Sequence, residues 1–489
     1  MQKIFHNLKR LVNHFYKSED GAVAMIYGPM AIVLLLAAGI SIDYARGYLV
    51  KKEIARALDA AVLAAGSLPV TDEVAMITIA KQYFDANISA STRKDYDPQI
   101  NVVVNNEEVT ATSSAIVPTI LMKLAGNDTM DINEKSVVGR TLVNIEVALV
   151  LDNTGSMSGS KMSSLKTAAK TLVDTLYATD GSSEYVEIAL VPFTGAVNIG
   201  TDNKYASWVD SESKSVAGQE DYGENQDYPW KTSLKGKTAY EVLDEYDRNW
   251  LGCVRARVGT GLTAEGTTVD LDLWDVPPSD SDVNTKWAPY VKPIHTLNGY
   301  NPVYNSWVKN VLKFKSTCPT AEILPLTNQK NTIKNQVDSM VASGYTSVPI
   351  GLIWGWRVLS SAEPYTEGDD ENNTENRKVI VLLTDGQNHH GYYNNGIYSA
   401  YGMPNYNHLG TGWLGNQLDD KLETICTNVK SQDILIYSIT FQLNDSNTQQ
   451  LMRECATRED MYFNSPDGSS LQEAFNQIAT GLQKLRLKE

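Results

Sequence analysis

Three oxygen-bearing side chains follow a run of apolar residues in the stretch VALVLDNTGSM, residues 147–157. They are Asp152, Thr154 and Ser156, spaced two residues apart. A carboxylate and two hydroxyls at this spacing suit three roles: ligation of a hard divalent cation, nucleophilic attack, or capping of the helix predicted to follow. Taken alone, the three residues leave all of these interpretations open.

Two further oxygen donors are predicted to reach the same place. Asp385 follows the apolar run 378–383, and Thr346 stands in a glycine-containing loop just before an amphipathic helix. Ligands of doubly wound sheets bind outside the carboxyl ends of the strands, so Asp152 and Asp385 are expected to lie together. Carboxylate and hydroxyl oxygens suit Mg²⁺, or another divalent cation such as Ca²⁺ or Mn²⁺. For Thr346, helix capping remains the alternative.

The same residues fit enzymatic chemistry poorly. A phosphoryl-transfer site would carry a second acid two residues after its aspartate nucleophile, where this chain has Thr154. A serine hydrolase needs a general base beside Ser156, and the sequence GSM differs from the G-x-S-x-G elbow. The histidines of the tyrosine-rich stretch 387–416 are better explained as solvated loop residues than as transition-metal ligands; they are His389, His390 and His408. We therefore expect that the chain is not an enzyme.

Strands and helices alternate along most of the chain after residue 144. Continuous apolar runs predict strands, and apolar residues at helical spacing predict amphipathic helices. The predicted strands are 145–151, 186–193, 378–383, 434–441 and, at an edge, 461–464. The predicted helices are 162–177, 418–429, 448–455 and 471–485. Together they indicate an α/β fold, a doubly wound parallel sheet with helices on both faces.

The regular alternation stops in the middle of the chain. We assign residues 144–199 and 326–489 to the doubly wound domain. Residues 200–325 are rich in Trp, Tyr and Asp and are too long for a loop, so they predict a large inserted subdomain at the rim of the sheet. The four cysteines allow three pairings. The local choice pairs Cys253 with Cys318 and Cys426 with Cys455, and such bridges require an oxidising compartment.

The N-terminal part of the chain carries a candidate membrane span. Residues 21–42 are 22 uncharged residues, and a transmembrane helix needs about 20. The segment 1–20 holds four cationic side chains, which predicts a cytoplasmic N-terminus with the rest of the chain outside the cytoplasm. Residues 43–143 are predicted to continue the helix to about residue 66 and then to form a small α+β region. The net charge of −16 argues against nucleic acid as a partner.

The oxygen donors resemble a known motif set. D-x-T-G-S-M at 152–157, Thr346 in its loop and T-D-G at 384–386 look like the metal-ion-dependent adhesion site of von Willebrand factor type A domains. The resemblance implies that Thr154 and Ser156 ligate the metal directly and that Asp152 and Asp385 bind it mainly through water. It implies that Thr346 binds the metal directly or through water. It also implies that a carboxylate of a protein partner completes the open metal position. Thr154 stands where serine is commoner.

Other segments resemble pilus-assembly proteins. The candidate span, the sequence DYARGYLVKKEIARALDAAVLAAG that follows it, and GLIWGWRVLS at 351–360 are similar to the TadG type of tight-adherence (Flp) pilus assembly protein. The resemblance implies a single-pass bacterial inner-membrane protein with a periplasmic type A domain, and pilus or envelope proteins as partners. Ile26 replaces the glutamate that follows the processing glycine of related minor pilins, which favours a retained anchor. The alternative is a pilus-associated or surface-displayed adhesin that binds host protein or glycan.

Overall fold

A computed structural model describes residues 20–68, 73–105, 108–139, 143–177, 183, 185–222, 236–245, 249–263, 266–290, 318–389, 399–402 and 414–485. The chain divides into two compact units, residues 1–141 and 142–489. Each unit has its own hydrophobic core. The candidate metal ligands all belong to the second unit.

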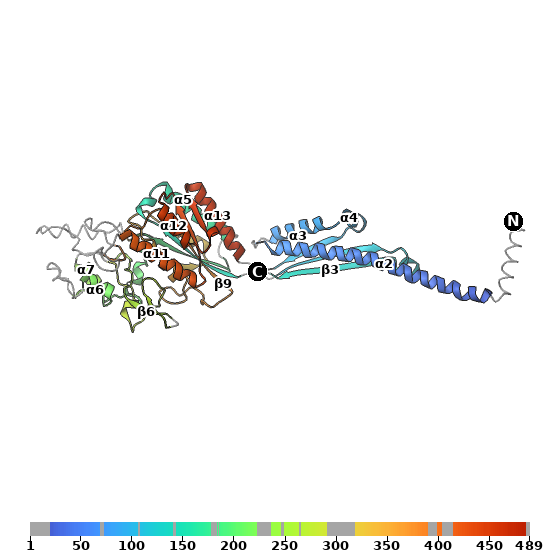
Figure 1. Cartoon of the computed structure of the whole chain (residues 1–489), viewed down its shortest axis with the longest axis horizontal. Helices are drawn as coiled ribbons and strands as arrows, with labels where there is room; N and C mark the ends of the chain where they lie inside the picture. Colours follow the sequence, from blue (N-terminus) through green and yellow to red (C-terminus); the bar gives the residue numbers. More distant parts are fainter. Residues whose placement is uncertain are drawn as a thin grey trace. The chain divides into compact units, whose positions relative to one another are not determined.

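A single helix of 47 residues, α2 (Asp20–Gly66), begins the first unit. Its N-terminal part extends beyond the sheet (Figure 1), and apolar side chains between Ile26 and Ile42 are largely exposed there. Among the described residues, α2 is the one helix that is long and apolar enough to cross a membrane. The second half of α2 buries a stripe at helical spacing that includes Ile54, Leu58 and Ala65. The prediction of one continuous helix through residue 66 is confirmed.

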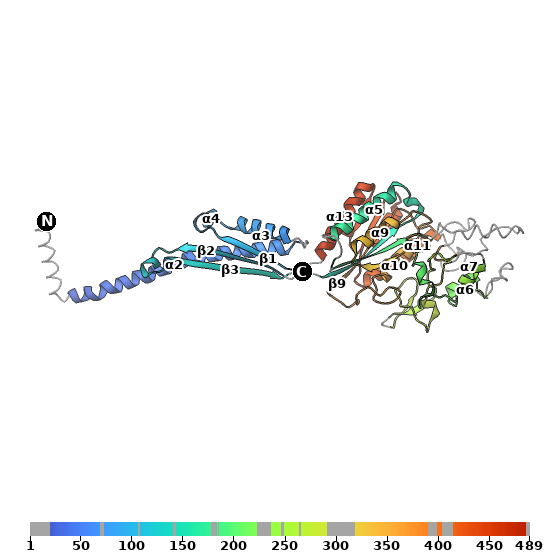
Figure 2. The same cartoon turned by 180° about the vertical axis from the view of Figure 1, so that it is seen from behind.

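A small antiparallel sheet covers the second half of α2. The strands β1 (Gln99–Val104), β2 (Glu108–Pro118) and β3 (Thr129–Gly139) lie in sequence order. Helices α3 (Glu73–Asn87) and α4 (Ala90–Tyr96) precede them, and α3 runs alongside α2 (Figures 1 and 2). Burial alternates along β2, whose inward side chains pack on α2. The small α+β region expected from the sequence is therefore present.

The second unit is built on a six-stranded sheet with the order β11-β10-β9-β4-β5-β8. Adjacent strands are parallel except for β8, which is antiparallel to β5 at one edge. The strands are β4 (Asn144–Asp152), β5 (Val186–Phe193), β8 (Leu324–Thr327), β9 (Asn376–Thr384), β10 (Leu435–Phe441) and β11 (Tyr462–Ser465). Five of them match predicted strands. The short strand β8 was not predicted, and it begins inside the range assigned to the insertion.

Helices cover both faces of this sheet, which confirms the doubly wound fold class. Side chains of β4 alternate between two cores: Val147 and Leu149 enter one, and Ala148 and Val150 enter the other. The first core is closed by α5 (Ser160–Leu176), α9 (Lys330–Ser339) and α13 (Gly468–Leu485). The second is closed by α10 (Val348–Arg357), α11 (Leu414–Ser431) and α12 (Ser446–Cys455). Helix α9 was not predicted.

The described part of residues 200–325 packs into the second core instead of forming a core of its own. Trp208 and Trp287 belong to the same apolar cluster as Val150 and Trp354. Regular structure in this part is short: η3 (Thr201–Tyr205), α6 (Val216–Tyr222), α7 (Ala239–Glu245), β6 (Thr260–Leu262), β7 (Thr268–Asp270) and η4 (Val283–Thr285). The insertion is thus continuous with the main fold on one face of the sheet.

Two disulfide bonds join the residues that the local pairing predicts. Cys253 is bonded to Cys318, and Cys426 is bonded to Cys455. The first bond closes the described part of the insertion against the segment that leads into β8, and the second links α11 to the end of α12. All four cysteines of the chain are therefore oxidised.

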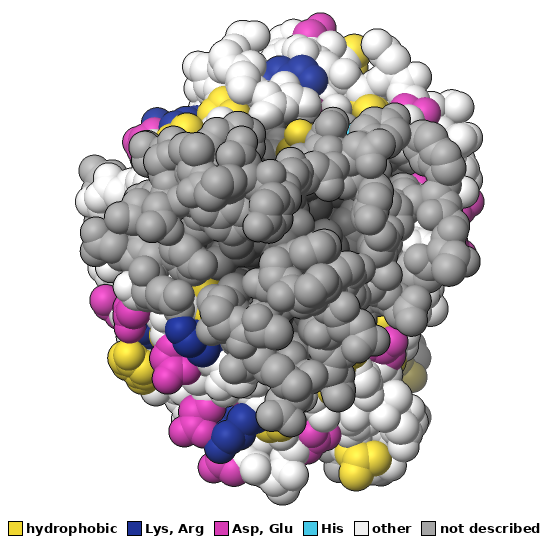
Figure 3. All heavy atoms as spheres, turned by 90° about the vertical axis from the view of Figure 1, so that its left-hand side faces the viewer, with side chains coloured by type: hydrophobic (Ala, Val, Ile, Leu, Met, Phe, Trp, Pro, Cys, Tyr) yellow, Lys and Arg dark blue, Asp and Glu magenta, His cyan; other side chains and the backbone are white. Residues whose placement is uncertain are grey.

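Described charges of both signs are interspersed at the end of the second unit where α6 and α7 lie. In the view of this end, Lys and Arg side chains lie beside Asp and Glu side chains at the lower left, and further Asp and Glu side chains lie along the right-hand margin (Figure 3).

Candidate functional site

Two carboxylates meet where the neighbouring strands β4 and β9 end. Leu151 of β4 pairs with Leu383 of β9, which places Asp152 beside Thr384 and Asp385. The hydroxyl of Thr384 donates a hydrogen bond of 2.7 Å to Asp152 Oδ2, and the backbone N–H of Asp385 lies 3.4 Å from the same oxygen. Both carboxylates are buried. The structure thus brings Asp152 and Asp385 together, as the sequence led us to expect.

The hydroxyls of Thr154 and Ser156 connect the two carboxylates. The backbone N–H of Thr154 donates to Asp152 Oδ1 at 2.8 Å, so the chain turns back immediately after β4. This turn places Thr154 Oγ1 2.9 Å from Ser156 Oγ, and Ser156 Oγ donates to Asp385 Oδ1 at 2.5 Å. Four of the five candidate ligands therefore form one hydrogen-bonded cluster of oxygen atoms.

Thr346 approaches the cluster from a loop that is bonded to the end of β4. Gly155 N donates to Gly344 O at 3.0 Å, and Ser343 N donates to Asn153 O at 2.7 Å. Gly344 has φ +77°, a left-handed conformation that favours glycine. A Cβ added to Gly386 would lie 3.3 Å from Thr346 Oγ1 and 3.7 Å from Ser156 Oγ, so both hydroxyls face Gly386. Thr346 is thus held beside the cluster by the backbone bonds of its loop.

Helix capping does not account for these side chains. Helix α5 begins after Gly159, without a side-chain cap, and α10 begins after Ser347, also without one. The short helix η2 (Gly155–Met157) has Thr154 at its N-cap, but the Thr154 hydroxyl makes no capping bond. The hydroxyls of Thr154, Ser156 and Thr346 are therefore available for another role.

Lys161, which the sequence interpretation missed, supplies a cation to the cluster. Its ammonium group lies 2.6 Å from Asp385 Oδ2, and the Asp385 side chain is fully buried whereas that of Lys161 is 21% exposed. Lys161 is in the first turn of α5, which follows the D-x-T-G-S-M motif after a short link. A lysine nine residues after Asp152 was visible in the sequence, but only the start of α5 shows that it reaches Asp385.

Burial and charge repulsion govern the protonation of Asp152. Burial, and then the nearby Asp385 carboxylate, raise the pKa of Asp152 to about 6, whereas hydrogen bonds from Thr154 and Thr384 lower it. Two close carboxylates hold a proton unless a cation replaces it. The electrostatics of the pair therefore favour binding of a positive charge, of which the Lys161 ammonium is one example.

The donor set suits a hard divalent cation. Two carboxylates and three hydroxyls are all oxygen donors, the type of ligand that Mg²⁺, Ca²⁺ and Mn²⁺ prefer. Among the described residues, no three side chains of His, Cys, Asp or Glu come together as a metal-binding group. The candidate site is not a group of this kind, because it has only two carboxylates and its other three candidate ligands are hydroxyls. The residues present fit a divalent cation by donor chemistry, with Asp152, Thr154, Ser156, Thr346 and Asp385 as its candidate ligands.

Aromatic rings form part of the rim of this site. The ring of Tyr345 stacks on that of His389, with 5.4 Å between centroids and 17° between planes. His389 is also held by a backbone hydrogen bond of 2.8 Å to Thr346 O. His389 thus has a packing role beside the candidate ligands, while His390 and His408 lie outside the described residues.

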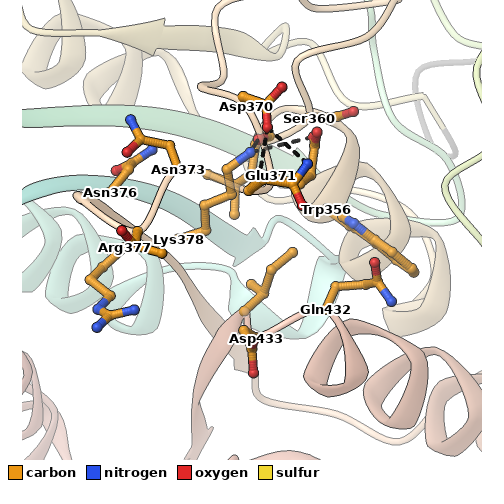
Figure 4. A pocket seen from close by; sticks show the side chains of 14 residues that line it. Trp356, Ser360, Asp370, Glu371, Asn373, Asn376, Arg377, Lys378, Gln432 and Asp433 are labelled. Carbon is orange, nitrogen blue, oxygen red and sulfur yellow. Dashed lines mark hydrogen bonds and ion pairs between the residues drawn. The ribbon is translucent and has the colours of Figure 1, made fainter. Parts of the chain in front are cut away.

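A polar pocket lies at the other end of the parallel strands, where β9 begins (Figure 4). Its volume is about 100 Å³, and Ser360, Glu371 and Lys378 are among the residues that line it. The ammonium of Lys378 donates to Leu359 O at 2.7 Å and to Asp369 O at 2.6 Å. Because backbone carbonyls satisfy this buried lysine, we assign it a structural role in holding the loop before β9.

Comparison with known proteins supports the N-terminal part of the sequence interpretation. Residues 21–68 match the family model described as "Putative Flp pilus-assembly TadE/G-like". The resemblance of this segment to Flp pilus-assembly proteins is thereby confirmed. No curated protein matches the chain.

Several solved structures are similar to this chain. The pilus adhesin SpaC from Lactobacillus rhamnosus GG has 12% identity and a TM-score of 0.35, over 82% of this chain and 36% of that one. The von Willebrand factor domain of the type V pili tip protein Mfa5 from Porphyromonas gingivalis has 10% identity and a TM-score of 0.36, over 71% of this chain and 98% of that one.

A von Willebrand factor type A protein from Catenulispora acidiphila has 14% identity and a TM-score of 0.28, over 79% of this chain and 49% of that one. The chain spans about a third of the length of SpaC. The doubly wound fold is assigned from the strand order of the six-stranded sheet.

Proposed function

We propose that this chain is a membrane-anchored periplasmic protein of tight-adherence (Flp-type) pilus assembly or anchoring. Its second unit binds an acidic group of a protein partner through a Mg²⁺-dependent adhesion site. The observation that carries the proposal is the convergence of Asp152, Ser156 and Asp385 at the carboxyl ends of two adjacent strands. The match of residues 21–68 to a pilus-assembly family model supports the biological setting.

The residues around the cation have distinct tasks in this proposal. Ser156 and Thr154 offer hydroxyl oxygens directly, whereas the buried carboxylates of Asp152 and Asp385 supply the negative charge. The bound cation would provide an electrophilic position that a carboxylate of the partner completes. Ser156 Oγ donates to one oxygen of Asp385 and keeps its lone pairs for the cation, whereas the Lys161 ammonium contacts the other oxygen and competes for that carboxylate.

In this proposal the site lies outside the cytoplasm. Residues 21–42 of α2 span the inner membrane once, and the cationic segment 1–20 stays in the cytoplasm. Both disulfide bonds lie in the second unit and agree with an oxidising compartment. The proposed role is binding without catalysis.

The test is cross-linking of the membrane-embedded chain to envelope proteins, with and without a chelator. The wild type and the control variant Asp338→Ala should give the same Mg²⁺-dependent product, since Asp338 is an exposed residue that pairs with Lys170. Asp152→Ala should give none, because half of the carboxylate pair is lost. A product that forms equally in Asp152→Ala or in chelator would refute a metal-mediated contact.

A further inference from the structure

The turn between β2 and β3 is fastened to the end of the apolar part of α2. Asp43 is the first charged residue after the uncharged run 21–42, and its carboxylate is buried. It accepts hydrogen bonds from the backbone N–H groups of Ile120 at 3.0 Å, Leu121 at 2.7 Å and Met122 at 2.8 Å. The last of these residues begins the short helix η1 (Met122–Ala125). We call residues 119–128 the anchor-side turn.

The anchor-side turn also reaches down along the apolar run. A Cβ added to Gly39 would lie 2.6 Å from Leu121 Cβ, so the Leu121 side chain occupies the space that glycine leaves open. Gly39 precedes Asp43 by four residues, and an α-helix rises about 1.5 Å per residue, so Leu121 contacts α2 about 6 Å below the level of Asp43. Part of the turn therefore lies level with the last turn of the apolar run.

Two large apolar side chains of this turn are exposed. Ile120 is 61% exposed and Leu124 is 74% exposed, and Lys123 beside them is also exposed. On α2 just after Asp43, Tyr44 and Tyr48 are exposed as well. Large apolar side chains flanked by Lys and Tyr are typical of the boundary between lipid headgroups and acyl chains.

We propose that the anchor-side turn is a second membrane contact, in which Ile120 and Leu124 enter the outer boundary of the same bilayer that α2 crosses. Its depth of about 6 Å below Asp43 falls within the 5–10 Å over which interfacial segments insert. Lys123 then faces lipid phosphates. The inference depends on the membrane anchor of the proposed function, and the occupant is assigned as lipid because the exposed side chains continue the apolar surface of α2.

Two contacts with one bilayer fix the orientation of the first unit more firmly than one spanning helix does. A single spanning helix leaves rotation about its axis and tilt weakly fixed. A second contact at one side of α2 selects one orientation of the β1–β3 sheet relative to the membrane surface. The first unit then acts as an oriented base for whatever the chain binds.

Site-directed fluorescence on the full-length chain in vesicles tests this inference. All four native cysteines are in disulfides, so a single introduced cysteine can be labelled selectively with an environment-sensitive dye. The labelled positions are Ile120→Cys and Leu124→Cys, in vesicles of phosphatidylcholine and phosphatidylglycerol that carry nitroxide-labelled lipid. Val103→Cys is the matched control, because Val103 is an exposed apolar residue of β1 that pairs with Thr110, away from the turn.

Dye at 120 and 124 should show blue-shifted emission and quenching by nitroxides near the headgroups, whereas dye at 103 should show neither. Ile32→Cys, within the apolar run, reports the anchor separately. If dye at 32 is quenched by deep nitroxides but dye at 120 and 124 behaves like dye at 103, the anchor stands and the second contact is refuted. If dye at 32 is not quenched, the anchor itself is refuted. A blue shift at 124 without lipid quenching would mean that protein covers the turn, which also overturns the inference.

Discussion

The ammonium of Lys161 lies 2.6 Å from Asp385 Oδ2, so a side chain of the protein itself places a positive charge on a buried carboxylate of the candidate metal site. The other oxygen of that carboxylate accepts a hydrogen bond from Ser156. Lys161 thus compensates part of the charge that burial of Asp152 and Asp385 creates. A divalent cation that uses Asp385 has to compete with this internal cation.

Replacing Lys161 with methionine should strengthen Mg²⁺ binding. A hydrogen bond to a charged group contributes about 1.5–3 kcal/mol, so losing it from the metal-free state should lower the Mg²⁺ dissociation constant roughly tenfold or more. Calorimetric titration measures the change. Lys170→Met is the control, since Lys170 lies on the same helix and pairs with Asp338 at the surface. Equal or weaker affinity in Lys161→Met would show that Lys161 does not compete.

Stabilisation by Mg²⁺ should grow as the pH rises. The pKa of Asp152 is raised on folding to about 6, so between its unfolded value and about pH 6 the folded, metal-free protein holds more protons than the unfolded chain. The stability of the metal-free protein therefore falls as the pH rises through this window. Above about pH 6 the proton has left Asp152, and a cation that takes its place binds better. The gain in melting temperature from Mg²⁺ should be small at about pH 5 and larger at about pH 7.5. In Asp152→Asn this pH dependence should vanish; a gain that is flat with pH in the wild type contradicts the assignment.

Reduction of the disulfides should destabilise the second unit. The Cys426–Cys455 bond closes a loop of 29 residues, for which the chain-entropy relation gives roughly 3–4 kcal/mol. Chemical denaturation of Cys426→Ser/Cys455→Ser against the wild type measures this cost. Alkylation of the unreduced, denatured wild type should modify no cysteine. Four reactive thiols would overturn both the pairing and the oxidising compartment.

Removal of the Asp43 carboxylate should free the anchor-side turn. In Asp43→Ala, the N–H groups of Ile120, Leu121 and Met122 lose their acceptor together. Hydrogen exchange measured by mass spectrometry should accelerate in the peptide that contains them and stay unchanged in β1. Asp85→Ala is the control, because Asp85 makes an exposed ion pair with Arg93, and such pairs contribute little. Unchanged exchange at residues 120–122 would mean that the carboxylate does not hold the turn.

Strong periodic signals explain which elements the sequence predicts. Strands such as β4 and β9 are continuous apolar runs that end in Asp152 and Thr384–Asp385, so both the elements and the convergence of the acids follow from pattern and sheet topology. The four-residue strand β8 carries a proline at Pro325 and too few apolar residues to stand out. The polar helix α9 buries only Ile333 and Val337 among its apolar residues, so its periodicity is weak.

Contacts between distant segments explain what the sequence did not reveal. Lys161 reaches Asp385 only because α5 starts at Ser160, and nothing local marks that lysine as part of a site. The bond of Asp43 to residues 120–122 joins positions more than 70 residues apart and depends on the packing of β2 and β3 against α2. Residues 200–325 were predicted to form a subdomain at the rim of the sheet, and nothing in their sequence shows that Trp208 and Trp287 pack into the core beside Trp354.

Thermal unfolding of the full-length chain with Mg²⁺ and with a chelator tests the central claim most directly. If Asp152, Ser156 and Asp385 hold a divalent cation, Mg²⁺ at about a hundred times its dissociation constant should stabilise the second unit by about 2.7 kcal/mol. The same gain is expected for the surface variant Asp338→Ala, and none for Ser156→Ala or Asp385→Ala. Identical melting of the wild type in Mg²⁺ and in chelator, or a Mg²⁺ gain that survives in Asp385→Ala, would contradict the account.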